Sequence, residues 1–324
     1  MVRLDIVIPV YNEEALLPEL TTRLNTVLGT LEGVQSVVTL VDDGSHDGSV
    51  AWLRTYTTQN PTFRLVELSR NFGHQAAISA GIAAADPNAD ALIVMDGDLQ
   101  DPPELIPDLV AAWREGADVV QAVRRSRSER GLRGLGFSLF HALLHRLTDL
   151  PSGGNTGVFA LLSRPAATAL RSLPERNRFL PGLRAWIGFT QHDVLFDRPS
   201  RPGGPPKQSL RRLARYAMDA FFGFSYKPLR LMTGFGLVVS TLGFLLATVF
   251  ILRRLLSYEI ADTGFTTLVT LILFLGGIQL LCFGVLGEYI ARVYDEAKGR
   301  PLFVVRPPQH AAPKPDDSPR NPDA

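Results

Sequence analysis

Leu92-Ile93-Val94-Met95-Asp96-Gly97-Asp98-Leu99-Gln100-Asp101-Pro102-Pro103-Glu104 joins an apolar run to an acidic turn and a Pro-Pro pair. Four consecutive apolar residues before a turn predict a short buried strand. Proline is favourable in the first turn of a helix, where its missing N–H has no intrahelical partner to lose. The stretch therefore predicts a strand, an acidic loop and a helix in direct succession.

The acidic loop carries two carboxylates separated by one residue. Because the chain is leaving the strand here, we expect Gly97 to let it turn, so that Asp96 and Asp98 converge on one point. Converging carboxylates suit Mg²⁺ or Mn²⁺, hard cations that keep part of their coordination shell for a phosphate. Asp is also common in ordinary turns, so this pair alone does not separate a metal site from a polar turn.

The rest of the N-terminal half supplies the context for this loop. Further apolar runs at 4–10, 37–41, 64–68 and 118–120 predict strands, and helical periodicity lies between them. This alternation predicts βαβ units and a mostly parallel α/β sheet, in which ligands bind at the carboxyl ends of the strands. Polar clusters follow four of these strands, at 11–14, 42–45, 69–74 and 96–101. Four such clusters on one edge predict a binding site.

Several classes of function are excluded or disfavoured. No G-x-G-x-x-G follows the first strand and no G-x-x-x-x-G-K-[ST] occurs, which argues against a Rossmann dinucleotide site and a P-loop NTPase. The formal net charge is +1, so bulk charge does not indicate nucleic-acid binding. The single cysteine, Cys282, excludes a disulfide framework. The apolar run at the N-terminus is too short for a signal peptide, so we expect the first domain to be cytoplasmic.

An arginine-rich segment follows the fifth predicted strand, with five arginines among residues 124–133. Such a segment can bind an anionic ligand or an anionic membrane surface, or can simply form a solvated charged face. A short strand is predicted at 158–162, and 198–207 is a Pro/Gly-rich loop.

The C-terminal third is predicted to meet a membrane. Residues 209–227 have basic and apolar faces at helical spacing, typical of a helix in the membrane interface, with a packed core helix as the alternative. Two apolar segments follow, at about 229–252 and 265–287, each long enough to cross roughly 30 Å of hydrocarbon. Basic residues flank this hairpin and place both flanks in the cytoplasm, although Arg253 and Arg254 on the far side count against this orientation.

The predicted organisation is therefore a domain at 1–208, a juxtamembrane helix at 209–227, a two-helix transmembrane hairpin at 228–291 and a cytoplasmic tail at 292–324. The tail is rich in Pro and Asp from about residue 307, which predicts disorder. The whole would be a multi-pass protein of the inner membrane, with both termini cytoplasmic.

Four motifs in this order resemble those of the family 2 glycosyltransferases: Val7–Glu14, Val41–Ser45, Leu68–Gln75 and Met95–Glu104. More narrowly, they resemble the polyprenyl-phosphate subfamily, which includes dolichyl-phosphate-mannose-synthase-like and bactoprenol-glucosyltransferase-like enzymes. The resemblance continues through Arg178-Phe179, Trp186–Phe189, Pro228–Arg230 and Gly287–Arg292, and covers the chain to about residue 306. Each motif alone is weak or moderate, and their order and spacing together are highly specific.

The resemblance implies a GT-A fold, a UDP- or GDP-sugar donor, Mg²⁺ or Mn²⁺, and inverting transfer to a polyprenyl phosphate such as undecaprenyl phosphate. The reaction would take place at the cytoplasmic membrane face and serve cell-envelope glycan or lipid modification. The sugar, the nucleotide, the lipid length and the oligomeric state, a homo-oligomer included, stay open. No nucleic-acid partner is implied.

The resemblance also assigns roles to single residues. The nucleoside pocket would be lined by Pro9, Tyr11, Glu13 and Asp42, with Asp43 nearby. The metal and the donor diphosphate would be held by Asp96 and Asp98. The remaining catalytic positions would be Gln100 and Asp101 facing the sugar or acceptor, Arg124 and Arg127 near the phosphates, and Lys207 in a loop over the site.

One departure from the family pattern concerns catalysis. Relatives commonly read Gly-Asp-Phe-Arg where this chain reads Gly157-Val158-Phe159-Ala160, so the acid often proposed as base and its neighbouring arginine are missing. The lysine loop differs too, as Pro206-Lys207-Gln208-Ser209. A phosphate monoester is already mostly dianionic at about pH 7, so this nucleophile has little proton to lose. We therefore expect activity to survive, or the acceptor or sugar to differ.

Two other functions compete with this interpretation. The chain could be a membrane-bound partner that binds a nucleotide sugar without turnover, having lost chemistry at Val158 and Ala160. It could also be a synthase with a different acceptor. A processive polysaccharide synthase is disfavoured, because no Gln-x-x-Arg-Trp motif occurs and two spans are few for a polymer channel.

Overall fold

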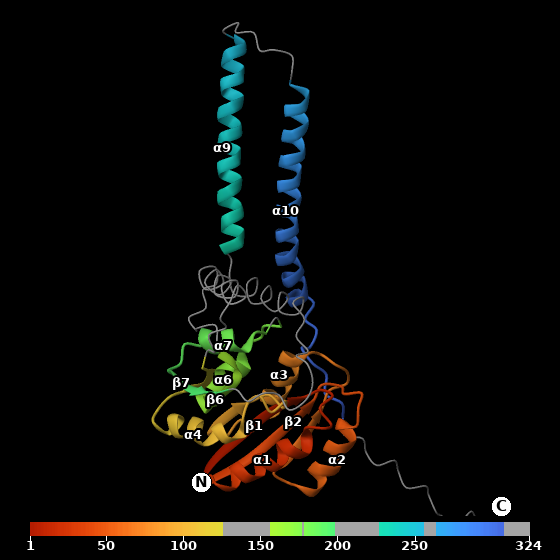
Figure 1. Ribbon diagram of the computed structural model, residues 1–324, viewed down its shortest axis with the longest axis vertical. Coiled ribbons are helices and arrows are strands. Elements are labelled where there is room, and N and C mark those ends of the chain that lie inside the picture. The colour runs from red at the N-terminus through yellow and green to blue at the C-terminus, as the bar shows by residue number, and fades with distance from the viewer. Residues whose placement is uncertain (126–155, 177, 198–226, 256–263, 308–324) are drawn as a thin grey trace, which may run out of the picture.

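A computed structural model describes residues 1–125, 156–176, 178–197, 227–255 and 264–307 (Figure 1). Two predicted site residues, Arg127 and Lys207, lie outside the described residues. The same holds for nearly all of the predicted amphipathic helix at 209–227 and for the tail from residue 308.

The N-terminal domain is built on one mixed sheet of seven strands in the order β3-β2-β1-β4-β6-β5-β7. All strands except β6 run in the same direction, and β6 lies antiparallel between β4 and β5. The strands are β1 (Val2–Val10), β2 (Val34–Asp42), β3 (Phe63–Glu67), β4 (Ala91–Val94), β5 (Val119–Arg124), β6 (Thr156–Ser163) and β7 (Gln191–Phe196). The predicted strands and the mostly parallel sheet are confirmed, and β7 is additional.

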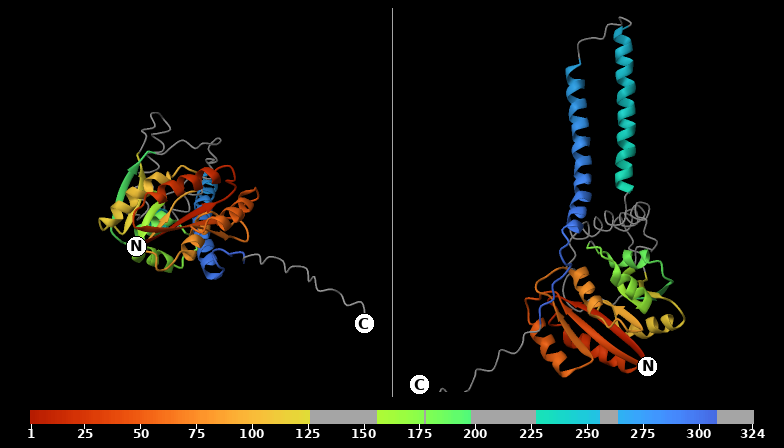
Figure 2. Two further views of the ribbon diagram at one scale, coloured as in Figure 1. Left: turned by 90° about the horizontal axis from the view of Figure 1, so that it is seen from below. Right: turned by 180° about the vertical axis from the view of Figure 1, so that it is seen from behind.

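Helices cover both faces of this sheet (Figure 2). One face carries α1 (Leu17–Gly29), α2 (Ser49–Gln59), the short 3₁₀ helix η1 (Pro103–Leu105) and α4 (Ile106–Arg114); the other carries α3 (His74–Ala84), α6 (Arg164–Ser172) and α7 (Leu180–Trp186). Because side chains alternate along a strand, β1 sends Ile6 and Ile8 into the first core and Val7 into the second. The domain is a three-layer α/β/α structure.

Helix α3 lies very close to the sheet, as its small residues predict. A Cβ atom on Gly81 would lie 2.2 Å from Cγ1 of Val7 and 3.0 Å from Cγ2 of Val41. A larger residue there would require the helix or the side chain of Val7 to shift. This close packing fixes where α3 begins, at His74, relative to the ends of the strands.

The reversed direction of β6 changes which of its residues reach the carboxyl edge of the sheet. Its register pairs Ala160 with Val94 of β4 and Thr156 with Val123 of β5. The beginning of β6, with Gly157 and Val158, therefore lies beside the ends of β4 and β5. The residues that differ from the family pattern come to the same edge as the polar loops.

Two long helices, α9 (Lys227–Leu255) and α10 (Phe265–Ala297), rise from the end of the domain at which α3 and α7 lie (Figure 1). Both predicted apolar segments are thus helical. Among the described residues, one segment, Phe274–Ala297, is long and apolar enough to cross a membrane, and Met232–Leu246 forms a shorter apolar helix.

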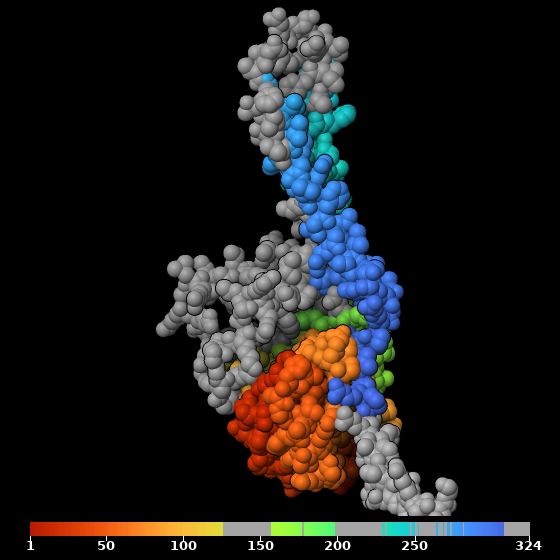
Figure 3. All heavy atoms as spheres, turned by 90° about the vertical axis from the view of Figure 1, so that its right-hand side faces the viewer, coloured from red at the N-terminus to blue at the C-terminus, as the bar shows by residue number. Residues whose placement is uncertain are grey.

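The chain after α10 returns to the N-terminal domain. Val305 forms an antiparallel bridge with Leu68, and the Ser69 N–H donates to the Val304 carbonyl at 2.9 Å. The side chain of Phe303 packs against the core on the α3 face. Figure 3 shows this C-terminal segment lying against the surface of the domain. The end of the hairpin is therefore attached next to the loop that follows β3.

Candidate active site

The loops after β1 and β2 are joined by hydrogen bonds. The Asn12 N–H donates to Ser45 Oγ at 3.0 Å, and the His46 N–H donates to Asn12 Oδ1 at 2.8 Å. The Glu13 N–H donates to Ser49 Oγ at 3.1 Å. Asn12 adopts a left-handed conformation with φ of 53°, which Asn tolerates better than most residues. The loops predicted to meet at the carboxyl edge do so here.

Asp42 shapes the loop that follows β2. Its carboxylate accepts the N–H of Gly44 at 3.0 Å and that of Ser45 at 3.2 Å. The residue is 2% exposed, and this burial raises the pKa of its carboxyl group. The predicted nucleoside residue thus holds the turn of its own loop.

Asp43 connects this loop to the one after β3. Its carboxylate accepts the Phe72 N–H at 2.7 Å and the Gly73 N–H at 3.0 Å, and burial raises its pKa. Gly44 lies between the two loops at φ 70°, and a Cβ there would be 2.6 Å from backbone atoms of Arg70 and Asn71. The two loops are therefore packed backbone to backbone.

The acidic turn after β4 is held by its own hydrogen bonds. The Asp96 N–H donates to Asp101 Oδ2 at 3.1 Å, and the Gln100 N–H donates to Asp98 Oδ1 at 3.1 Å. The left-handed residue of this turn is Leu99, with φ of 61°, and its side chain is buried. A non-glycine residue in this region carries strain, which is tolerated where the surroundings fix it.

The prediction that Gly97 provides the conformational freedom of this turn is wrong, since Gly97 has no positive φ. Its Cβ would instead lie 3.1 Å from the Pro9 carbonyl oxygen and 3.2 Å from Cγ2 of Ile8. A side chain there would make tight contacts, because the turn passes close to the end of β1.

Asp101 lies inside the protein, 2% exposed, under the turn. Its Oδ1 is 4.0 Å from Nη2 of Arg124, at the end of β5. Burial, reinforced by the charge of Asp96, raises its pKa to about 7, and Arg124 only partly offsets this. A further positive charge near these carboxylates would favour the ionised form of Asp101.

His74, the first residue of α3, reaches across to the acidic turn. Its Nε2 is 2.8 Å from Asp96 Oδ1, and 47% of its side chain remains exposed. The protein atoms around the ring lower the pKa of His74, and the charges of Asp43, Asp98 and Asp101 work against this shift. His74 belongs to the Leu68–Gln75 motif, but no role was predicted for it. Its position in a polar loop at the end of a strand was the signal in the sequence.

Other predicted residues have the following places. Pro9 is buried at the end of β1, Tyr11 is 40% exposed, and Glu13, Asp98 and Gln100 are partly exposed.

Glu104, the last residue of the acidic motif, accepts hydrogen bonds from Arg23 Nε at 2.8 Å and Nη2 at 2.6 Å, which fixes η1 against α1.

Arg184 is a buried charge that sequence analysis did not assign to the site. It is 2% exposed, and its guanidinium donates to the carbonyl groups of Gly157 and Val158 at the beginning of β6. This arginine of α7 therefore anchors the backbone of the segment that departs from the family pattern.

The donor atoms fit a divalent cation held jointly with a ligand. Within the described residues, no group of three or more His, Cys, Asp or Glu side chains could hold a metal ion by itself. Asp96 and Asp98 offer hard oxygen atoms beside the buried Asp101, and Mg²⁺ usually completes such a set with substrate phosphates and water. The acidic turn can therefore take part in a metal site when a diphosphate is bound.

Comparisons with known proteins agree with this geometry. The glycosyl transferase family 2 profile matches residues 5–170, and the GtrB C-terminal hairpin profile matches residues 227–293. An uncharacterized glycosyltransferase, sll0501, of Synechocystis is 43% identical over 94% of this chain and 95% of its own length. The prophage bactoprenol glucosyl transferase homolog of Escherichia coli K12 is 34% identical over 94% of this chain and 98% of its own.

Among solved structures, glucosyl-3-phosphoglycerate synthase from Mycobacterium tuberculosis aligns with 68% of this chain and 78% of its own at 21% identity, with a TM-score of 0.44. That likeness is too distant to inform the substrate. The family match, the full-length relatives and the observed sheet with its acidic edge agree. This chain is a glycosyltransferase with a GT-A fold and belongs to glycosyltransferase family 2.

Proposed function

We propose that this protein is an inverting glycosyltransferase that moves a sugar from a UDP- or GDP-sugar to a polyprenyl phosphate, such as undecaprenyl phosphate. The main observation behind this proposal is that the same chain contains a GT-A domain, with aspartates at the carboxyl edge of its sheet, and two long apolar helices. Relatives named bactoprenol glucosyl transferases, 34% identical over 94% of this chain, support the lipid acceptor.

The surface of the helix pair supports a location in the membrane. Large apolar side chains are exposed on α9 and α10, among them Leu237 at 68%, Phe244 at 73% and Leu280 at 74%. Water would be an unfavourable environment for so much exposed apolar surface. In the proposal both helices span the inner membrane, the catalytic domain and both termini are cytoplasmic, and the active site lies near the lipid headgroups.

In the proposed reaction an oxygen of the lipid phosphate attacks the anomeric carbon of the donor sugar. The bond from that carbon to the nucleoside diphosphate breaks, and the configuration inverts. Asp96 and Asp98 would hold Mg²⁺ or Mn²⁺, which neutralises charge on the departing diphosphate when bound. Asp101 positions the backbone of Asp96, and Arg124 adds positive charge at the same edge.

The proposed reaction needs no carboxylate base at β6. Val158 is 8% exposed and packs in the core, so its side chain offers no proton acceptor. General-base catalysis typically contributes about 10²–10⁴-fold by removing a proton. A phosphate with its second pKa near 6 has already lost most of that proton at about pH 7. Positioning and charge neutralisation then carry the reaction.

The test is a transfer assay with the full-length protein in membranes that contain undecaprenyl phosphate. A panel of labelled UDP- and GDP-sugars is supplied with Mg²⁺ or Mn²⁺, and lipids are extracted. We expect one labelled glycolipid, which requires both the metal and the lipid phosphate. Binding of a nucleotide sugar without glycolipid would support the non-catalytic partner instead, and label in a polymer would support a synthase.

A further inference from the structure

We propose that His74 is a positioning residue for the metal-binding carboxylate of Asp96. This inference rests on the proposed function, in which Asp96 and Asp98 hold the cation. The contact is direct, with 2.8 Å between His74 Nε2 and Asp96 Oδ1. An ionised carboxylate only accepts hydrogen bonds, so Nε2 carries the proton in this contact.

The backbone from which the imidazole extends is held in place. His74 follows Gly73, whose N–H is bound by the buried carboxylate of Asp43 at 3.0 Å. The Gly73 carbonyl accepts the N–H groups of Ala76 and Ala77 at the start of α3. Because α3 also packs closely on the sheet at Gly81, these contacts position the backbone at His74. A hydrogen bond from a side chain on this backbone restricts the orientation of the carboxylate that receives it.

Asp96 is therefore held from two sides by two different loops. Asp101 accepts its N–H at 3.1 Å and fixes the backbone, while His74 contacts its side chain. In metal sites, hydrogen bonds of this kind to ligand side chains set their orientation, and their loss typically costs 10–100-fold in metal affinity. The chain Asp43, Gly73, His74, Asp96 links the end of β2 to the end of β4.

The experiment measures Mn²⁺ binding by electron paramagnetic resonance of the free ion. Full-length protein in detergent is titrated with Mn²⁺ in the presence of UDP and, separately, of GDP. His74→Leu removes the donor at similar size, His74→Gln keeps an amide N–H near the position of Nε2, and His192→Gln on the exposed edge strand β7 is the control. Thermal unfolding without metal shows whether each variant is folded.

We expect His74→Leu to raise the Mn²⁺ dissociation constant about 10–100-fold. His74→Gln should recover most of this loss, and His192→Gln should change nothing. In the transfer assay, His74→Leu should raise the Mn²⁺ concentration needed for half-maximal rate far more than it lowers the rate at saturating Mn²⁺. If His74→Leu does not fold, His74→Asn takes its place, since its shorter amide does not reach the position of Nε2.

Equal Mn²⁺ binding by His74→Leu would overturn the inference, because the contact would then not affect affinity. Tighter binding would also overturn it and would show that His74 competes with the cation. Equal losses in His74→Gln and His74→Leu would also overturn it, because the hydrogen bond would then not be the cause. If wild-type protein binds no Mn²⁺ with either nucleotide, the metal assignment of the proposed function fails first and the role of His74 falls with it.

Discussion

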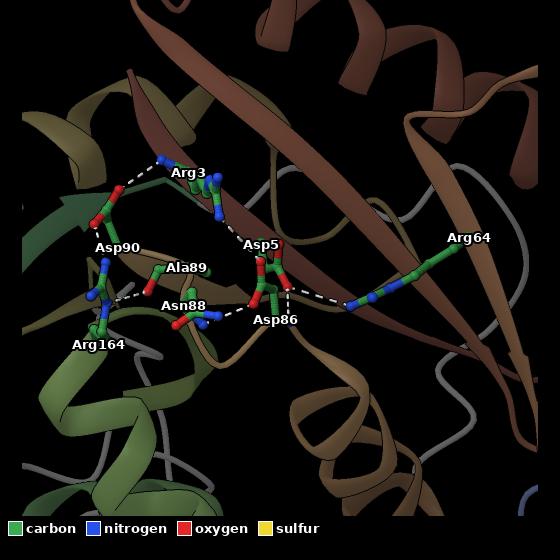
Figure 4. Close-up of polar contacts among 8 residues, drawn as sticks. All are labelled: Arg3, Asp5, Arg64, Asp86, Asn88, Ala89, Asp90 and Arg164. Atoms are coloured by element: carbon green, nitrogen blue, oxygen red, sulfur yellow. Dashed lines mark hydrogen bonds and ion pairs between the residues drawn. The ribbon is translucent and has the colours of Figure 1, made fainter.

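The two edges of the central sheet both carry clustered aspartates, and they differ in what neutralises them. At the amino-end edge, Asp5, Asp86 and Asp90 lie among three arginines: Arg3, Arg64 and Arg164 (Figure 4). At the carboxyl-end edge, five aspartates lie together, and among the described residues the basic side chains in contact with them are His74 and Arg124. The aspartates there are Asp42, Asp43, Asp96, Asp98 and Asp101.

The amino-end cluster satisfies its own charges. Buried Asp5 accepts the Asp86 N–H at 2.7 Å and faces Nη2 of Arg64 at 3.4 Å. Asp90 accepts the Arg3 N–H at 2.9 Å and pairs with Arg164. These contacts fix the loop between α3 and β4. Each acid there has an arginine partner, so this edge has no need of a further cation.

In the carboxyl-end cluster, the acidic side chains outnumber the basic side chains that contact them among the described residues. Asp42 and Asp43 are bound by backbone N–H groups, and Arg124 stays 4.0 Å from Asp101, whose pKa is raised to about 7. Aspartates at both edges accept hydrogen bonds from backbone N–H groups, so hydrogen bonding does not distinguish the two edges. The balance of charge within the described part of the chain does distinguish them, and it agrees with the proposal that the carboxyl-end edge receives a cation.

Of the variants that test the difference between the two edges, Asp98→Ala at the carboxyl-end edge should have the largest effect on sugar transfer. We expect the rate of sugar transfer to fall at least about 100-fold, in line with the loss of a group that stabilises transition-state charge. The thermal unfolding midpoint without metal should change little, since the Asp98 side chain is partly exposed. Rates are measured with purified lipid acceptor and stability by circular dichroism. Full activity of this variant would contradict the metal assignment.

At the amino-end edge, we expect Asp5→Ala to have the opposite effect, lowering stability and leaving transfer unchanged. It removes the acceptor of the Asp86 N–H and of Arg64 Nη2, while Arg64 Nε keeps its bond to Thr39 Oγ1, and should cost about 1–3 kcal/mol of unfolding free energy. The transfer rate per folded molecule should stay unchanged. Asp5→Asn keeps an acceptor for the Asp86 N–H and should lose less. Lost transfer with unchanged stability would show that this edge takes part in the chemistry.

Asp5 also predicts a dependence of stability on pH. Burial raises the pKa of Asp5 above its ordinary value of 3.8, against the opposing effects of the Asp86 N–H and Arg64. The folded state therefore keeps this proton to higher pH than the unfolded state. The associated stabilisation is complete below 3.8 and is lost as the pH rises through the folded-state pKa.

The side chain of Asn does not titrate, so the Asp5→Asn variant should not lose this stabilisation as the pH rises. Unfolding midpoints of both proteins, measured in steps from about pH 3.5 to 7, should show the wild type losing stability relative to the variant and then a constant difference. Parallel profiles over the whole range would contradict the assignment of the shift to Asp5.

Much of the carboxyl edge could be predicted from the sequence, because alternating strands and helices dictate where strand ends meet. The loops at 11–14, 42–45, 69–74 and 96–101 follow β1 to β4 as expected. The direction of β6 was not predictable in this way, since Thr156–Ser163 is equally apolar in either direction. Strand β7 was missed because Gln191–Phe196 is a mostly exposed edge strand with little hydrophobic pattern.

Side-chain partners at the site were less predictable than the loops. Leu99 adopts a left-handed conformation that its residue type disfavours, and only its buried surroundings fix it. The contact of His74 with Asp96 joins residues 22 apart in the sequence, and the pair Arg23–Glu104 joins residues 81 apart. Such contacts depend on the packing of α1 and α3 against the sheet, which no local pattern encodes.

The smallest stability effect should come from Arg164→Ala at the amino-end edge, and Arg124→Ala is its matched counterpart. Arg164 and Asp90 have side chains 49% and 35% exposed, and ion pairs as open as this contribute about 0–1 kcal/mol. Unfolding in denaturant should therefore shift little, and transfer should not change. Arg124 is 35% exposed, so its removal should also cost little stability. It should lower transfer, because it takes positive charge from the edge where, among the described residues, acidic side chains outnumber basic ones. Equal transfer rates in the two variants would mean that the charge imbalance does not serve the reaction.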